Sequence, residues 1–380
     1  MITMTARQRE LTTLTFGTPD VVPLSPGWGR KSTRSHWHAT GLPVSVDPVD
    51  IPEHAYRQAG GILPWPAPRL WLSPNERMIP QFEEKIIEER GDTRVVQDWK
   101  GNVCEISSEF SLEYLRDAID FVTRRWIRCP VESRADWEAM KKRYDPTTPE
   151  RIDTATFAAV AADPDRPNFL QYHFSGPFWQ LREWLGFENL CVAFYDEPDM
   201  VRDMLNFWGD YIAELLKRTI AVLKPDSVHI SEDMAYKAHP MIGPDMCREF
   251  LLPVWKRWGE VIRGAGITLY GCDSDGYIGD LIPLWIEAGI NFCDPIEVAA
   301  HNDIADFRRR FGRDMAYVGG VDKRAIARGG KAIENEINRL RPVIDDGGFI
   351  PSCDHGVPPD VSWPNFVYYT KLLATATGWL

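Results

Sequence analysis

The stretch GITLYGCDSDGYIGDLIPLWIEAGINFCDPIE, residues 266–297, decides the fold of this chain. It opens with a short apolar run, passes through a turn rich in aspartate and glycine, and reaches a second apolar run after a helical segment. A strand, a polar turn, a helix and a second strand make up the βαβ unit of parallel sheets. The chain is therefore expected to build a parallel α/β fold.

The same rhythm extends in both directions from this unit. Four further strand candidates with polar ends are NFLQYHFSG (168–176), DSVHISED (226–233), MAYVGGVD (315–322) and GFIPSCDH (348–355). Three of the connections have helical spacing, namely residues 200–223, 245–266 and 331–346. Pro253 is expected to kink the second of these helices. With Val21–Leu24 as the first strand, the pattern predicts seven strands that alternate with helices.

Parallel strands joined by helical crossovers leave two architectures, an open doubly wound sheet and a closed barrel. Polar residues stand at the C-terminal end of every run, whereas an open sheet gathers its ligands at one switch point. The nucleotide fingerprints GxGxxG and GxxxxGK[ST] are absent from the sequence. We therefore predict an α/β fold, a (β/α)8 TIM barrel with an N-terminal accessory lobe.

The accessory lobe is expected in the less regular first half of the chain. Residues 20–80 are rich in proline, glycine and tryptophan, which is typical of turns and rigid loops. Residues 81–100 change from a helical to an alternating pattern, and residues 110–126 and 133–144 have helical spacing. The prediction is one domain over residues 1–380, with a lobe or cap at about 30–150 inserted after the first strand.

Composition limits the partners. The chain has 380 residues, and 43 Lys and Arg against 55 Asp and Glu give a net charge of −12. That charge repels nucleic acid and anionic lipid. The seven cysteines are odd in number and widely spaced, so reduced thiols are expected. Neither a signal-peptide pattern nor an apolar run long enough to cross a membrane is present, so we predict a cytoplasmic protein with a small-molecule substrate, and a homodimer from size alone.

Residues able to carry chemistry stand at the ends of the candidate strands, where a barrel places its active site. They are His173; Glu232 and Asp233; Tyr270, Cys272, Asp273 and Asp275; Asp294 and Glu297; Asp322; and Cys353, Asp354 and His355. If these carboxyl groups converge, their pKa values must rise or a cation must neutralise them. A metal ion or a cationic group of the substrate would meet that need.

Three assignments have competing interpretations. Cys272 and Cys353, with Asp294 or Glu297, have the residue types of a catalytic zinc site, but such thiols also pack as small buried apolar groups. His355 is a candidate general acid or base because its ordinary pKa lies near neutrality, or it tethers the last loop.

Glu232 and Asp233 form either an acid–base pair or the cap of the next segment.

The sequence resembles the uroporphyrinogen decarboxylase superfamily, in a divergent branch. The resemblance lies in five segments: residues 9–27, 229–256, 274–298, 317–330 and 347–369. It implies a (β/α)8 barrel with the site at the C-terminal mouth. It also implies one of two chemistries.

The first is decarboxylation of a carboxylate-rich tetrapyrrole, which the namesake enzymes grip with an MRQAGR motif after the first strand. This chain has WGRKSTRSHW (28–37) there, and its nearest equivalent is Arg57-Gln58-Ala59-Gly60. The second is methyl transfer involving a corrinoid, with zinc held by a His-x-Cys pair and a later cysteine. Cys272 and Cys353 match the two cysteine positions, and Tyr270 stands at the histidine position.

The leading prediction is methyl transfer between a small methylated or methoxylated substrate and a corrinoid protein or thiol. The roles assigned are catalytic for His355, Glu232, Asp273, Asp275 and Asp354; substrate binding for His173, Asp233, Tyr270 and Asp322; and zinc binding for Cys272, Cys353, Asp294 and Glu297. The corrinoid would be carried by a partner protein. The alternatives are a metal-independent decarboxylase in which His355 or Asp275 protonates the carbanion, and a non-catalytic ligand-binding barrel.

Overall fold

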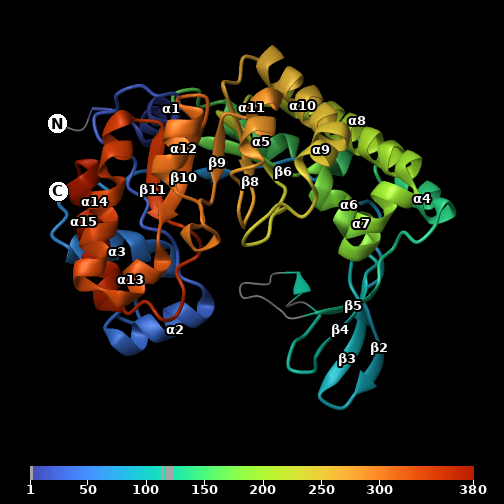
Figure 1. The fold of residues 1–380 in the computed structure, drawn as a ribbon, viewed down its shortest axis with the longest axis horizontal. Helices are drawn as coiled ribbons and strands as arrows, with labels where there is room; N and C mark the ends of the chain where they lie inside the picture. Colours follow the sequence, from blue (N-terminus) through green and yellow to red (C-terminus); the bar gives the residue numbers. More distant parts are fainter. Residues whose placement is uncertain (1–2, 113–114, 117–123) are drawn as a thin grey trace.

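The computed structural model describes residues 3–112, 115–116 and 124–380. Seven parallel strands form one curved sheet in the order β1-β6-β7-β8-β9-β10-β11, and helices connect them as in a TIM-like barrel (Figure 1). The strands are β1 (Leu70–Trp71), β6 (Leu170–Ser175), β7 (Ser227–Ser231), β8 (Leu269–Asp273), β9 (Phe292–Asp294), β10 (Ala316–Val321) and β11 (Phe349–Cys353). The six strands predicted from residue 168 onward are confirmed.

Strands β6 to β11 are largely buried on both faces, as expected for a parallel sheet covered by helices, whereas Trp71 of the edge strand β1 is exposed. The side chains of β8 alternate between the inside of the barrel and the layer of helices outside it. Leu269 packs in a small cluster inside the barrel, together with Phe292 and Ile350 from neighbouring strands. Tyr270 and Cys272, one position out of phase, belong to the large cluster between sheet and helices. Because successive side chains of a strand point to opposite faces, this parity decides which strand residues reach the site.

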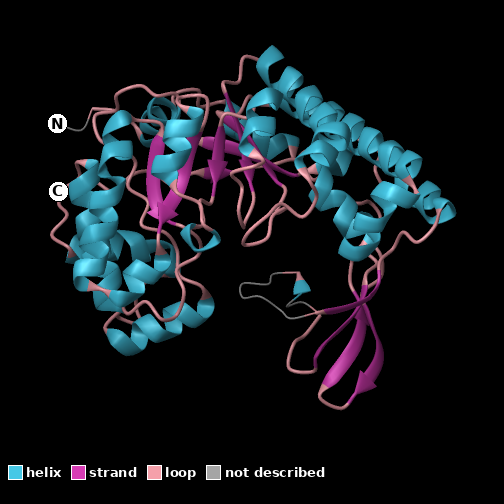
Figure 2. Cartoon of the chain, in the orientation of Figure 1, coloured by secondary structure: helices cyan, strands magenta, loops and turns pink. Residues whose placement is uncertain are grey.

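Helices cover the outer face of the sheet (Figure 2). The main ones are α6 (Pro177–Leu185), α7 (Phe187–Asp196), α8 (Pro198–Val222), α10 (Leu252–Gly264), α11 (Ile282–Ala288), α12 (Ile304–Phe311), α13 (Lys323–Arg328), α14 (Gly330–Asp346) and α15 (Trp363–Thr377). A π-helical turn, η4 (Cys247–Leu251), precedes Pro253 where a kink was predicted, since proline removes a backbone donor. None of the described helices is both long and apolar enough to span a membrane.

The predicted first strand is wrong. Val21–Leu24 has no strand structure; the backbone N–H of Val22 donates to Thr377 O at 3.1 Å, and Trp379 Nε1 donates to Val22 O at 2.7 Å. Pro23 has no N–H to give to a sheet. The barrel begins instead at β1, which pairs with β6. In the described part of the chain, the edges of β1 and β11 remain unpaired with each other.

The accessory lobe is a four-stranded antiparallel sheet that projects from the barrel (Figure 1). Its strands are β2 (Lys85–Arg90), β3 (Thr93–Gln97), β4 (Val103–Ser107) and β5 (Arg125–Arg128). The helical pattern at residues 81–90 was therefore misleading, because pairing with β3 turns this polar segment into an edge strand.

The expected helix at 110–126 lies largely outside the described residues, and its last two residues belong to β5. The helix expected at 133–144 is confirmed as α4 (Arg134–Lys141). Two further helices, α2 (Lys31–Thr40) and α3 (Ile51–Gln58), pack against α15. The proposed lobe bounds of about 30–150 remain a prediction.

Candidate functional site

A cavity of about 710 Å³ lies at the C-terminal ends of the barrel strands. Its wall combines strand ends, the loop before β2, and the turn between β3 and β4 of the lobe. The polar and charged lining residues are Glu76, Arg77, Lys100, His173, Ser175, Gln180, Glu183, Ser231, Asp233, Asp273, Asp275, Asp294, Ser352 and His355. Trp28, Trp99, Trp179, Trp184, Tyr144 and Met78 give the cavity aromatic and apolar walls. This combination is typical of a small-molecule site.

Two aspartates lie side by side at the ends of neighbouring strands, and they form the floor of the cavity. Asp273 and Asp294 are register partners on β8 and β9. His229 Nε2 lies 3.1 Å from Asp294 Oδ1, and this contact lowers the pKa of Asp294 while Asp294 raises that of His229. Burial and the charge of Asp294 raise the pKa of Asp273 to about 7. The floor therefore holds one ionised carboxylate and one carboxyl group that keeps its proton near neutral pH.

A serine hydroxyl connects this pair to a second histidine. Ser231 hydrogen-bonds to Asp273, and its Oγ lies 2.8 Å from His173 Nε2. The ring of His173 stacks on that of His229, with centroids 5.5 Å apart. Burial lowers the pKa of His173 to about 4, so its imidazole is neutral at physiological pH. A neutral imidazole both accepts and donates a proton. The hydrogen-bonded series His173, Ser231 and Asp273 can therefore carry a proton to Asp273.

Glu76 is a buried carboxyl that the sequence analysis missed. It accepts hydrogen bonds from the backbone N–H and the hydroxyl of Ser175, the last residue of β6, at 3.0 and 2.7 Å. Burial raises its pKa to about 7. Glu76 precedes the lobe in an irregular loop, and no local motif marks it.

His355 and Asp275 lie together on the cavity wall. His355 Nε2 is 3.4 Å from Asp275 Oδ2, and this interaction raises the pKa of His355. Its Nδ1 faces two donors, the backbone N–H of Gly356 at 2.7 Å and Arg30 at 3.0 Å. Nδ1 is therefore the nitrogen without a proton, and Nε2–H points to Asp275. His355 thus lines the cavity and also tethers the last loop, and its role as an acid or base stays a prediction.

Asp233 also lines the cavity but is paired with a cation. Arg182 on α6 lies 3.2 Å from the Asp233 carboxylate and donates to its carbonyl at 3.0 Å. Burial raises the pKa of Asp233, and Arg182 opposes the change. After β7, the cavity is therefore lined by the carboxylate of Asp233, whose negative charge is largely balanced by Arg182.

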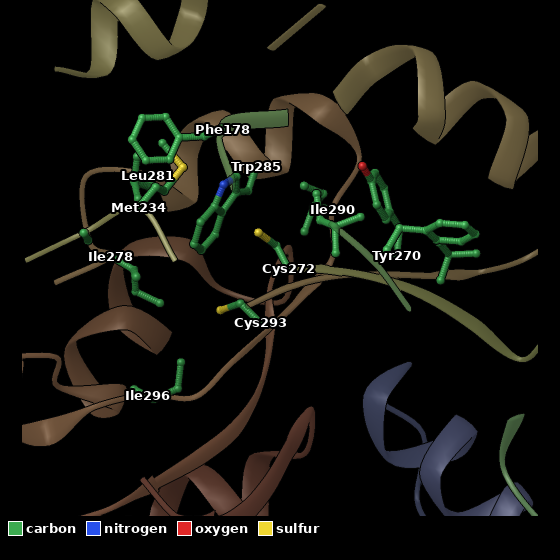
Figure 3. Packing of buried hydrophobic residues seen from close by; sticks show 14 of the residues in the cluster. Phe178, Met234, Tyr270, Cys272, Ile278, Leu281, Trp285, Ile290, Cys293 and Ile296 are labelled. Carbon is green, nitrogen blue, oxygen red and sulfur yellow. The ribbon is translucent and has the colours of Figure 1, made fainter. Parts of the chain in front are cut away.

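The two cysteines predicted to bind zinc do not fit that role. Cys272 is on the helix-facing side of β8, and Figure 3 shows its sulfur next to that of Cys293 among apolar side chains that include Trp285 and Ile290. Burial raises the pKa of Cys272 well above the ordinary value, and its surroundings are those of a small thiol packed among apolar groups. Cys353 lines the cavity, but its strand is separated from β8 by β9 and β10.

Within the described residues, no three His, Cys, Asp or Glu side chains come together as a metal site. Asp294 is committed to His229, and Glu297 lies 2.9 Å from Lys323 Nζ. The zinc assignment of Cys272, Cys353, Asp294 and Glu297 is therefore not supported by the donor set.

Glu232 is a buried anchor outside the cavity lining. Its carboxylate accepts the backbone N–H groups of Phe178 and Trp179 at the start of α6, at 2.9 and 3.2 Å, and Trp255 Nε1–H at 2.5 Å. A Cβ at Gly176 would lie 2.2 Å from this carboxyl group, so glycine permits the approach. Glu232 therefore caps α6, which precedes it in the chain, and not the next segment as predicted.

Asp354 is a second buried anchor. It accepts the backbone N–H groups of Val298 at 2.9 Å and Lys323 at 3.2 Å, and burial raises its pKa to about 6. Asp354 therefore ties β11 to two neighbouring loops.

Three more predicted residues stand apart from the cavity lining. Tyr270 is buried on the helix side of β8, Asp322 caps α13 and pairs with Arg324, and Glu297 accepts the backbone N–H of Gly276 at 3.0 Å. The substrate-binding roles of Tyr270 and Asp322 have no support from these positions. The strand-end argument found Asp273, Asp275, Asp294, His173, Asp233 and His355 at the cavity.

Strand parity would have found His229 and Ser231, because both follow the inward phase of β7. No such pattern in the sequence marks the lobe residues that line the cavity. Trp99 and Lys100 come from the turn between β3 and β4, and Asp98 fixes this turn by accepting the backbone N–H groups of Lys100 and Asn102, both at 2.9 Å. Lys100 forms an ion pair with Glu183 of α6.

Solved structures with a similar fold cover almost all of the chain. A methyltransferase from Methanosarcina mazei has 12% identity and a TM-score of 0.59, with 99% of both chains covered. A B12-independent methionine synthase from Shewanella sp. W3-18-1, in complex with selenomethionine, has 10% identity and a TM-score of 0.46, with 94% of this chain and 97% of the other covered. At these identities the likeness concerns the fold alone.

Sequence comparison identifies the family. No curated protein matches the chain. The sequence profile of uroporphyrinogen decarboxylase (URO-D) matches residues 126–374, well over half of the chain. This range runs from β5 of the lobe through all barrel strands after β1 and most of α15. The protein with the acidic, aromatic-walled cavity described above therefore belongs to the uroporphyrinogen decarboxylase family.

Proposed function

We propose that this protein is an enzyme that removes a methyl group from a small methylated or methoxylated molecule, with Asp273 as the proton donor to the leaving atom. One observation carries the proposal. Asp273 is a carboxyl group on the cavity floor that is still partly protonated at neutral pH, because its pKa is raised to about 7. A general acid works best when its pKa lies near the working pH.

The step is balanced as follows for a methyl ether. The bond between methyl carbon and oxygen breaks, the oxygen keeps the electron pair, and the methyl group passes to a nucleophile. Asp273 gives its proton to the oxygen, and the product is an alcohol or phenol. The acceptor is a substrate from outside the chain, either the cobalt of a corrinoid on a partner protein or a thiol.

Neighbouring residues support this role for Asp273. The contact with His229 lowers the pKa of Asp294, and burial together with the negative charge of Asp294 raises the pKa of Asp273. After the transfer, Ser231 and the neutral His173 connect Asp273 to a proton source. Zinc has no part in this proposal, because the described residues offer no donor set for it.

The charge of the floor favours methyl transfer over decarboxylation. A decarboxylase must place the carboxylate of its substrate next to the proton donor, which here means beside Asp294 and near Asp275. Like charges repel strongly in a site of low dielectric constant. A neutral methyl ether meets no such repulsion.

The experiment supplies free reduced cobalamin and a panel of methoxylated benzoates to the purified chain. Formation of the corresponding phenol is followed by mass spectrometry, and carbon dioxide release is measured in the same samples. We expect phenol formation that falls about 100-fold or more in Asp273→Asn, the usual size of a general-acid effect. Asp314→Asn is the control, because Asp314 is exposed and lies outside the cavity.

Three results would contradict the proposal. Release of carbon dioxide without phenol would identify a decarboxylase instead. Phenol formation that is equal in Asp273→Asn and in the unchanged chain would remove Asp273 from the reaction. Ligand binding without any turnover, with the methyl acceptor varied between cobalamin and a thiol, would favour the non-catalytic alternative.

A further inference from the structure

The barrel wall has a gap beside the segment that was predicted as the first strand. A pocket of about 280 Å³, the seam pocket, lies there between residues 23–25, residues 65–69 and the helix α1 (Ala6–Leu14). Pro23 and Pro26 have no N–H to give to a sheet, so this segment does not close the barrel between β1 and β11. The seam pocket therefore occupies a break in the wall of the barrel.

The seam pocket reaches the interior of the barrel. Its lining includes Val318 of β10 and Ile350 of β11, which are register partners at the small cluster inside the barrel. Val318 also lines the cavity of the candidate site (the main cavity), and its side chain is only partly buried. The side chain of Val318 is thus a wall that the two spaces share.

The charge of Arg69 gives a second, independent indication that the two spaces are close. Arg69 lines the seam pocket and forms an ion pair of 2.6 Å with Glu10. Its positive charge lowers the pKa of Asp294 and opposes the rise in the pKa of His229. Because Asp294 is part of the floor of the main cavity, the seam pocket contains a group within electrostatic reach of that floor.

The rest of the partition is weakly held. Residues 23–25 line the seam pocket, and Gly27 and Trp28 line the main cavity, so one short segment passes along both spaces. In the part of the chain that the structure describes, the backbone of residues 23–27 forms no hydrogen bond, whereas the backbones of Val22 and Trp28 do. A segment without backbone hydrogen bonds separates from its neighbours at a low cost in free energy. The partition can therefore open without breaking the sheet.

The lining of the seam pocket suits an uncharged aromatic molecule. Its charged side chains are paired, Arg69 with Glu10 and Arg9 with Asp20, both at 2.6 Å. These paired charges favour neither an anion nor a cation. Much of the remaining lining is apolar and comes from prolines and from Trp65, Trp71 and Trp379. Indole rings offer flat apolar surfaces on which a planar ring packs.

We propose that the seam pocket is a second opening of the main cavity, through which small uncharged aromatic molecules enter and leave past Val318. The position of the opening rests on the lining residues alone, and its use rests on the proposed function. A corrinoid protein that brings cobalt to the floor must cover the mouth of the barrel. A neutral methyl ether or phenol then needs another route, and the seam pocket supplies it.

The test follows the exchange of para-fluoroanisole, an uncharged methyl ether, by fluorine NMR on the full chain. Line-shape analysis gives the dissociation constant and both rate constants. Ala67→Phe narrows the seam pocket, and Ala67 lies outside the lining of the main cavity. We expect association and dissociation to slow by the same factor, about threefold or more, because a blocked route changes the rates and leaves the bound state as it was. The dissociation constant should stay unchanged.

Three further variants sharpen the result. Ser25→Met narrows the seam pocket from the opposite wall and should slow exchange in the same way, even if Ala67→Phe does not fold. Val318→Ala removes part of the partition, so both rate constants should rise. Ala161→Phe is the matched control, because Ala161 is exposed at the end of α5 (Thr154–Ala161) and lies outside both linings. Circular dichroism confirms that each variant is folded.

Exchange rates that are equal in Ala67→Phe, Ser25→Met and the unchanged chain would overturn the proposal, because all exchange would then pass through the mouth. A weaker dissociation constant at an unchanged association rate would also overturn it, since the probe would then stay in the seam pocket. The same holds if para-fluoroanisole does not bind at millimolar concentration.

Exchange requires no methyl acceptor, so these outcomes are independent of turnover. Exchange through the seam pocket without demethylation would contradict the proposed reaction and leave the second opening standing. Demethylation with exchange rates that Ala67→Phe and Ser25→Met leave unchanged would do the reverse.

Discussion

Replacing Asp273 by asparagine should make the folded protein more stable at alkaline pH. In the native cavity, burial and the charge of Asp294 raise the pKa of Asp273 from 3.8 to about 7. In the unfolded chain the same carboxyl group ionises at its ordinary pKa. Folding therefore loses stability as the pH rises above 3.8, and the loss is complete above pH 7. Asparagine has nearly the same shape and does not titrate, so Asp273→Asn escapes this loss.

The size of the gain follows from the pKa difference. Each pH unit corresponds to about 1.4 kcal/mol, so a difference of about three units sets an upper limit of about 4 kcal/mol. Asp273 lines a cavity that reaches solvent, and screening by water reduces this value to about 2 to 4 kcal/mol. A chain of 380 residues has an unfolding entropy of about 0.8 kcal/mol per kelvin, so Tm should rise by about 3 to 5 K.

Differential scanning calorimetry at pH 5 and pH 8.5 checks this prediction. The advantage of Asp273→Asn should have reached about a third of its full size at pH 5, should grow further up to about pH 7, and should be constant at higher pH. Asp314→Asn should show no such pH dependence, because Asp314 is exposed. Equal destabilisation by Asp273→Asn at both pH values would refute the argument, since it would mean that the carboxylate stabilises the native cavity.

Three further predictions concern residues whose roles the structure reassigns or pairs. Glu232→Ala should lower the free energy of unfolding by about 2 to 4 kcal/mol in urea titrations, because it leaves two buried N–H donors and one partly buried N–H donor without an acceptor. Near-normal stability with lost turnover would instead make Glu232 catalytic. Cys272→Ser should leave the metal content of the purified protein unchanged by inductively coupled plasma mass spectrometry, because the sulfur faces the helix layer; a loss of zinc would restore the ligand assignment. Asp275→Asn should lower the pKa of His355 in NMR titrations, because the contact with Asp275 is what raises it; an unchanged pKa would show that the loop contacts of His355 control its titration.

Local pattern was sufficient for most of the barrel. Short apolar runs between polar turns mark β6 to β11, because a parallel strand buried on both faces needs little beyond a few apolar residues and a turn. The same reasoning failed for Val21–Leu24, because the backbone groups of Val22 form hydrogen bonds with Thr377 at the end of α15 and with Trp379 instead of a neighbouring strand. It also failed for β2, a polar edge strand that pairing with β3 holds in place.

The sequence by itself determined that carboxyl groups end the barrel strands, and it placed Asp273, Asp294 and His355 at one mouth. Only the tertiary structure decided what each group does there. Strand parity turns Cys272 to the helices and Asp273 to the cavity, although the two are adjacent in sequence. Packing makes Glu232 a helix cap, and the turn between β3 and β4 brings Trp99 and Lys100 to the cavity wall. The physical reason is that a pattern along one strand fixes alternation, whereas burial, charge pairing and the approach of distant loops depend on the assembled fold.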